Sequence, residues 1–200
     1  MRVPYAPKEA PSDAPQNVKD IYTRIAARRA PRPLIPLDLA LLHNPNIADG
    51  WNTLLGAIRS KTTLPQRVTE LAVCRVAVLN DASYEWQSHS PLALAGGVSK
   101  EGLATVLSTP RLPQGKSGKS EGEGGLSEKE WAVLVYVDAM TRDVNVEEST
   151  WEEMRKWFGE TESVELTATV AGYNCVSRFL VALNVGEANG GEMKVPEGKK

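Results

Sequence analysis

The stretch that decides the fold runs from Leu64 to Gly97 and reads LPQRVTELAVCRVAVLNDASYEWQSHSPLALAGG. Its first half places apolar residues on nearly all sides of the predicted helix, which a helix tolerates only inside a protein. Pro65 suits the first turn of a helix, and Thr63 with Gln66 has the spacing of a capping box. The pattern predicts one buried helix from this cap to about Asn80 and a second helix that follows it.

Three titratable side chains in this stretch form the candidate catalytic cluster. Glu70 lies on the buried helix, where an isolated carboxylate is costly unless it is paired, so we expect a partner close by. Glu85 and His89 are four residues apart on the next helix and share one of its faces. A histidine exchanges protons near neutral pH, and either carboxylate could hold its ring in one tautomer. Two carboxylates placed close together would also leave one of them protonated as an acid.

The same residues resemble the carboxymuconolactone decarboxylase family, which shares an all-helical fold with the alkylhydroperoxidase D-like proteins. The resemblance is carried by Glu70, the LAVCRVA run at 71–77, Tyr84-Glu85-Trp86, His89 and the LALAGG run at 92–97. In the peroxidase branch, a Cys-x-x-Cys pair stands between the glutamate and the histidine. The decarboxylase branch is expected to show a glutamate before the histidine, as this chain does.

Ala82 and Glu85 occupy the two positions of that cysteine pair, so no thiol pair is available to reduce peroxide. The resemblance, which extends loosely from about Pro33 to Gly186, therefore implies a cofactor-independent lyase. Its substrate would be a small carboxylated lactone or a related enolisable ring compound, decarboxylated with protonation at carbon. An isomerase or cyclase using the same proton transfer is the first alternative, and a non-catalytic oligomeric helical protein is the second.

Four more side chains are candidates for binding this acidic substrate. Arg75 could hold a substrate carboxylate, with a salt bridge to Glu70 or to a neighbouring subunit as the alternative. His43 lies at a helix junction before Pro45 and faces either a pocket or the surface. Tyr84 belongs to the family-like motif. Trp51 is either a substrate platform or an ordinary core or interface residue.

Metal and thiol chemistry are weakly supported by the sequence. A site made by His89, Glu85 and His43 is conceivable but has no recognised ligand spacing, so we assign no metal and no cofactor. Cys74 and Cys175 lie in apolar helices and are interpreted as small core residues.

The length of 200 residues favours one domain. The formal net charge of -2 gives no sign of nucleic-acid binding. The N-terminus lacks the apolar core of a leader, and no run looks apolar enough to cross a bilayer, so the expectation is a cytoplasmic protein without a membrane partner. Residues 112–125 are rich in Gly, Ser and charge and are expected to be a mobile loop, with a lid as the alternative. The two Gly-Lys-Ser triplets there lack the other features of a phosphate-binding loop.

Caps and periodicity predict an all-α, single-domain bundle of about seven or eight helices, alkylhydroperoxidase D-like. Residues 1–33 form a Pro-rich arm with one helix over 16–29, which packs either on its own domain or on a neighbouring subunit. Residues 34–186 form the helical domain, and 187–200 a flexible tail. The resemblance also implies a homo-oligomer, a trimer or hexamer. The capping signals for the later helices are Ser99, the capping box of Ser127 and Glu130, Asn145 with Glu148 at a helix start, and Gly159 at its end.

Overall fold

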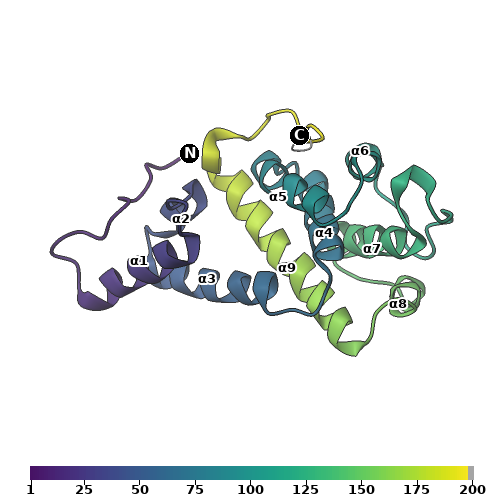
Figure 1. The fold of residues 1–200 in the computed structure, drawn as a ribbon, viewed down its shortest axis with the longest axis horizontal. Coiled ribbons are helices and arrows are strands. Elements are labelled where there is room, and N and C mark those ends of the chain that lie inside the picture. The colour runs from purple at the N-terminus through teal and green to yellow at the C-terminus, as the bar shows by residue number, and fades with distance from the viewer. Residues whose placement is uncertain (198–200) are drawn as a thin grey trace.

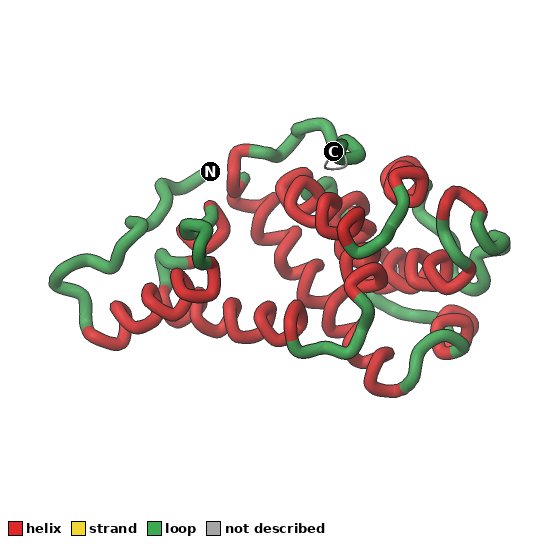
Figure 2. The backbone as a smooth tube through the Cα atoms, in the orientation of Figure 1, coloured by secondary structure: helices red, strands yellow, loops and turns green. Residues whose placement is uncertain are grey.

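The computed structural model describes residues 1–197 and contains nine α-helices and no β-strand over that range (Figures 1 and 2). The predicted all-α fold is confirmed, with nine α-helices in place of seven or eight. The helices are α1 (Gln16–Arg29), α2 (Pro36–Leu41), α3 (Pro45–Ser60), α4 (Gln66–Leu79), α5 (Ser83–Ala95), α6 (Lys100–Ser108), α7 (Glu128–Asp138), α8 (Glu148–Arg155) and α9 (Glu160–Leu183).

Helix α4 lies at the centre of the main core, as its continuous apolar run predicts. Nearly all of its residues are buried, and it packs against α5, α7 and α9. Trp86 of α5, Leu134 of α7 and Leu166 of α9 are fully buried around it. Burying such a side chain contributes about 1.5–3 kcal/mol each, which makes this cluster the main source of stability.

Helices α1 to α3 form a second, smaller core. Figure 1 shows α9 crossing between these three helices and the group formed by α4 to α8. Ile21, Tyr22 and Ile25 on one stripe of α1 are buried against Leu39 and its neighbours. The backbone N–H of Ala6 donates to the Leu39 carbonyl at 3.1 Å. The Pro-rich arm therefore packs on its own chain in this structure.

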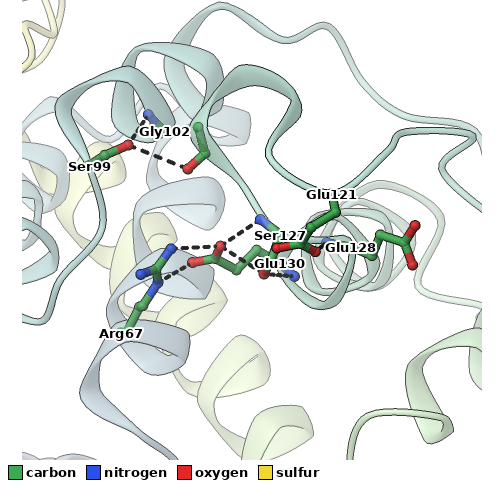
Figure 3. Close-up of polar contacts among 8 residues, drawn as sticks. Arg67, Ser99, Gly102, Glu121, Ser127, Glu128 and Glu130 are labelled. Atoms are coloured by element: carbon green, nitrogen blue, oxygen red, sulfur yellow. Dashed lines mark hydrogen bonds and ion pairs between the residues drawn. The ribbon is translucent and has the colours of Figure 1, made fainter.

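Two ion pairs join α4 to α7. Arg67 contacts both carboxylate oxygens of Glu130, at 2.6 and 2.9 Å (Figure 3). Arg75 contacts both oxygens of Asp138, at 2.7 and 2.6 Å. Arg75 follows Arg67 by eight residues and Asp138 follows Glu130 by eight, so the two contacts advance together along both helices.

Two of the predicted caps are confirmed. The Ser99 side chain accepts a hydrogen bond from the Gly102 N–H at 2.9 Å (Figure 3). Ser127 and Glu130 form the expected capping box at the start of α7. Glu130 therefore serves α7 as a cap and α4 as an ion-pair partner at the same time.

Three other boundary predictions are wrong. The Thr63 hydroxyl donates to Glu165 at 2.8 Å and forms no capping box with Gln66. Helix α4 begins after Pro65, without a side-chain cap. Helix α8 begins after Glu147 without a side-chain cap, so Asn145 does not act as one. Gly159 precedes α9 and does not end α8, which finishes at Arg155.

The C-terminal segment lies against α5. Ser83 Oγ donates to the Gly191 carbonyl and Trp86 Nε1 donates to the Lys194 carbonyl, both at 2.8 Å. These contacts differ from the flexible tail that composition predicts for 187–200. The last three residues of that predicted tail lie outside the described range.

Helix α9 is, among residues 1–197, the one helix long and apolar enough by length and composition to cross a membrane. This differs from the expectation that no run would pass that test. The helix packs against α3, α4 and α5. A core helix of a globular protein has the same length and composition, so the observation is weak evidence for a membrane span.

Candidate active site

Glu70 and His89 lie in direct contact across α4 and α5. His89 Nδ1 is 2.7 Å from Glu70 Oε2, and both side chains are buried. The expected partner of Glu70 is therefore His89. With Glu70 ionised, Nδ1 carries the hydrogen that bridges the pair, so Nε2 keeps a lone pair for a ligand. Of the two carboxylates that could orient the ring, the structure selects Glu70.

Tyr173 of α9 completes the packing around the histidine. Its ring meets His89 edge-on, with centroids 4.9 Å apart and an angle of 84° between the planes. Burial raises the pKa of the Tyr173 phenol, so this side chain stays neutral. This contact could not be predicted from the sequence, because Tyr173 is one apolar position among many on a long helix.

Glu85 is buried without a hydrogen-bond partner. Neither of its carboxyl oxygens has a partner within the described part of the chain. Burial raises the pKa of the Glu85 carboxyl well above its usual range, which favours the neutral acid. Glu85 therefore differs from Glu70: burial favours its neutral form, and no group within residues 1–197 forms a hydrogen bond with its carboxyl oxygens.

His89 and Glu85 both line a cavity of about 240 Å³ between α1, α3, α5 and α9. Two predicted substrate-binding residues, Trp51 and Tyr84, also line it. Apolar side chains of α3 and α9 form much of the wall, and the sequence did not single them out. These are Leu55, Val176 and Leu180.

Tyr84 is held in the cavity wall by close packing on Gly186. Gly186 has a φ of +71°, and a Cβ atom there would lie 2.3 Å from the Tyr84 ring. Only glycine leaves room for the ring in that place. The backbone N–H of Gly186 donates to the Tyr5 hydroxyl at 2.8 Å, which connects this wall to the N-terminal arm.

Four arginines line the same cavity and were missed by the sequence analysis. They are Arg28, Arg29, Arg32 and Arg59. Three of them come from the run RIAARRAPR at 24–32, whose density of positive charge is the signal that could have indicated an anion site. Their meeting with Arg59 on α3 depends on tertiary packing.

Arg75 and His43 do not line the cavity, which corrects two of the predicted substrate-binding residues. The Arg75 guanidinium is fully buried between Asp138 and backbone carbonyls, including Val106 at 3.0 Å, so it has no free donor for a substrate. His43 is exposed, and its Nε2 lies 2.6 Å from the Pro4 carbonyl. The metal set that would have needed His43 is not brought together.

The remaining candidate groups lie elsewhere. Cys74 is buried as predicted, and burial raises its thiol pKa well above the usual range. Cys175 is exposed, which corrects its interpretation as a core residue. Neither cysteine lines the cavity, and neither does any residue of the loop 112–125, so that loop is not a lid over it. Within residues 1–197, no group of three His, Cys, Asp or Glu side chains is placed to bind a metal ion.

The sequence pattern of the carboxymuconolactone decarboxylase family matches residues 45–117. This region holds Glu70, Glu85 and His89. The resemblance to the carboxymuconolactone decarboxylase family is confirmed. The arginines of α1 lie outside the region that matches the family.

Solved structures confirm the alkylhydroperoxidase D-like fold. One is a protein of unknown function from Agrobacterium tumefaciens, a candidate antioxidant defence protein AhpD, at 20% identity and a TM-score of 0.59, covering 71% of this chain and 90% of that one. Another is the debrominase Bmp8, as its C82A variant with 2,3,4-tribromopyrrole, at 18% identity and a TM-score of 0.60, covering 92% of this chain and 89% of that one. No curated protein matches this sequence.

Proposed function

We propose that this protein is an acid–base enzyme that decarboxylates a small carboxylated lactone, or a related enolisable ring compound, and protonates the carbon left behind. One observation carries the proposal: a histidine oriented by a buried carboxylate shares a cavity wall with an unpartnered carboxylic acid. The match to the family over residues 45–117 supports the reaction class.

The two acid–base groups have separate roles in this mechanism. The carbon–carboxylate bond breaks, carbon dioxide leaves, and the electron pair moves into a conjugated carbonyl of the substrate as an enolate. The neutral Glu85 acid donates a hydrogen bond to that oxygen, where negative charge develops. His89, which takes up a proton from water at Nε2 before this step, then gives that proton to the carbon, while Glu70 stabilises the imidazolium that carries it.

The substrate itself supplies the electron acceptor in this scheme, so the reaction as proposed uses no cofactor. The arginines around the cavity favour an acidic substrate, and the cavity volume suits a single ring. The debrominase of similar fold was solved with a five-membered ring, which agrees with that size. An isomerase or cyclase would use the same two groups without the loss of carbon dioxide. A cytoplasmic location and a homo-oligomeric state stay predictions.

The test is proton NMR in deuterated water with a panel of carboxylated lactones and enolisable keto acids. We expect deuterium on carbon, with carbon dioxide release for the decarboxylated substrate. His89→Ala should lose this activity by at least about 100-fold, the usual contribution of general acid–base catalysis. His43→Ala is the matched control, because it removes the other histidine of the chain outside the cavity and should keep full activity.

The competing hypothesis is a non-catalytic protein in which the cluster is structural. It predicts that His89→Ala mainly lowers the melting temperature and that no panel compound exchanges. A folded His89→Ala variant with wild-type exchange rates would refute the enzymatic proposal.

Thiol chemistry is disfavoured because Cys74 is buried and Cys175 lies away from the cavity. We expect a thiol reagent to modify the native chain once, at Cys175, and the denatured chain twice. The native Cys175→Ser variant should be unreactive. Rapid modification of Cys74 in the native protein would show an accessible thiol and reopen the peroxidase alternative.

A further inference from the structure

The hydroxyl group of Tyr173 has no hydrogen-bond partner within residues 1–197, although the residue is only 3% exposed. The comparable buried tyrosine is Tyr136, which is 2% exposed and whose hydroxyl lies 2.7 Å from Thr167 Oγ1. Buried phenols usually have such a partner, because a polar group left unpaired away from water is costly. The cavity that Tyr173 lines is therefore the place where its partner would be found.

This hydroxyl lies among the charged groups of the cavity wall. Burial is the main cause of the raised pKa of Tyr173, the charge of Arg59 opposes the shift, and the charges of Glu70 and Glu85 add to it. Arg59 and Glu85 line the same cavity as Tyr173. A phenol that stays protonated can donate one hydrogen bond, and no group in the described chain accepts it.

The Tyr173 ring is held in a fixed place. Its edge packs on the His89 ring, with the centroids 4.9 Å apart. At the preceding residue, Gly172, a Cβ atom would lie 2.9 Å from Ile58 Cδ1, so a side chain there would push α9 away from α3. Helix α9 also packs against α4 and α5, which carry Glu70, Glu85 and His89. The donor is therefore preorganised beside the acid–base groups.

We infer that Tyr173 is a further catalytic residue, whose hydroxyl donates a hydrogen bond to the substrate oxygen on which negative charge develops. This inference rests on the proposed function, in which Glu85 donates to the same oxygen. Hydrogen bonds to a charged oxygen are roughly twice as strong as those to a neutral one, so two such donors favour the enolate over the carbonyl compound. The proton stays on Tyr173 throughout, and no bond of the phenol breaks. The ligand group assigned to Tyr173 and Glu85 is therefore an enolate or phenolate oxygen.

The test uses 4-nitrophenolate as a stable analogue of the enolate and nitrobenzene as the matching ring without the charged oxygen. Calorimetry measures the binding of each in a buffer basic enough to ionise 4-nitrophenol but not Tyr173. The proteins are wild type, Tyr173→Phe, which keeps the ring beside His89 and loses only the hydroxyl, and Tyr136→Phe. Tyr136→Phe is the matched control, because that hydroxyl is already paired with Thr167 and Tyr136 does not line the cavity.

We expect Tyr173→Phe to weaken phenolate binding about tenfold or more, as the loss of a hydrogen bond to a charged acceptor does, and to change nitrobenzene binding by less than about twofold. Tyr136→Phe should bind both ligands as wild type does. Should Tyr173→Phe not fold, Tyr173→Met gives the same comparison, since it also lacks the hydroxyl and fills much of the space.

Four results overturn the inference. They are no phenolate binding by wild type at millimolar concentration, unchanged phenolate binding in Tyr173→Phe, equal weakening of both ligands in that variant, and loss of the phenolate absorbance band on binding. The last result would show that the ligand takes a proton from the site in place of accepting a hydrogen bond.

Deuterium exchange separates this inference from the proposed function. Tyr173→Phe should slow exchange at saturating substrate by about 100- to 1,000-fold, the usual cost of losing one oxyanion donor, with little change in KM. Full exchange in folded Tyr173→Phe overturns the inference and leaves the proposed function. Selective loss of phenolate binding in Tyr173→Phe, with no exchange by wild type for any panel compound, supports the oxyanion site and counts against the proposed reaction.

Discussion

At the scale of single residues, the two carboxyl groups beside the histidine have opposite environments. Glu70 is paired with His89, whereas Glu85 is buried with no partner in the described chain. A buried polar group without a partner costs about 1–3 kcal/mol. Such a cost is typical of a functional position, where the missing partner is supplied by a ligand.

Glu85→Gln should change how stability depends on pH. The folded-state pKa of Glu85 is raised, so the folded protein holds this proton more tightly than the unfolded chain does. Wild-type stability therefore falls as pH rises above the unfolded-state pKa of about 4.3, by at most about 1.4 kcal/mol per pH unit, and levels off above the folded-state pKa. Glutamine does not titrate, so the variant lacks this dependence of stability on pH.

The measurement is the melting temperature of both proteins between pH 4 and pH 8. We expect the melting temperature of the variant to rise relative to that of wild type as the pH increases. Glu101→Gln, at an exposed carboxylate, serves as the control and should show no comparable trend. A constant difference between Glu85→Gln and wild type across this range would show that Glu85 is ionised in the folded protein.

The sequence allowed part of this site to be predicted. A carboxylate on an all-apolar helix needs a partner, and the following helix offered His89, so local reasoning reached the contact. The arginines of the cavity wall could not be predicted in the same way, because Arg28 and Arg59 come to the same cavity only through the packing of α1 on α3. Arg75 was assigned to the cavity because its true partner, Asp138, lies 63 residues further along the chain.

At the scale of elements, α4 and α7 are joined by an ion pair that no water reaches. Arg75 and Asp138 are both fully buried, and the Leu112 N–H also donates to Asp138 at 2.6 Å. The desolvation of both charges is compensated only while every partner is present. Removing one member leaves the other charged and buried.

Arg75→Ala should therefore cost about 3–5 kcal/mol of unfolding free energy, measured by urea denaturation. Arg24→Ala breaks an exposed pair and should cost no more than about 1 kcal/mol. Comparable losses in the two variants would contradict the difference in burial. Since Arg75 lies outside the cavity, any folded Arg75 variant should keep the wild-type rate of deuterium exchange.

Helix positions were largely predictable because caps and periodicity are local signals. Ser99 and Ser127 cap within three residues, and both predictions are confirmed. The prediction for Thr63 was wrong because its hydroxyl donates to Glu165, about a hundred residues further along the chain. The contacts of the Gly-rich C-terminal segment could not be predicted, since they are made mostly by its backbone carbonyls.

At the scale of the whole molecule, the C-terminal segment covers the helix that carries Glu85 and His89. Trp86 is fully buried, and its indole N–H donates to the Lys194 carbonyl. Residues 191–195 also bring Met193 and Val195 against the main core. The segment thus stabilises α5, the helix that carries both candidate catalytic side chains, through its contacts with Ser83 and Trp86.

Removal of residues 191–200 should lower the free energy of unfolding by about 1–3 kcal/mol, with a loss of roughly 2–4 °C in melting temperature for each kcal/mol. Trp86 should also become more accessible, which a red shift and increased quenching of tryptophan fluorescence would report. Truncation after Val195 is the control, because it keeps the Lys194 carbonyl. Equal stability of the two truncated chains would contradict a role for this contact.

The two ion pairs between α4 and α7 fix the register of the helices. Eight residues span roughly 12 Å of helix, so the pairs act at two separated points and resist both sliding and rotation. A single-residue insertion between Arg67 and Arg75 would turn one of them by roughly 100° and break at least one pair. We therefore expect insertions or deletions between these positions to occur in both helices together or in neither. The loop at 112–125, by contrast, can change length at an entropic cost of only a few tenths of a kcal/mol.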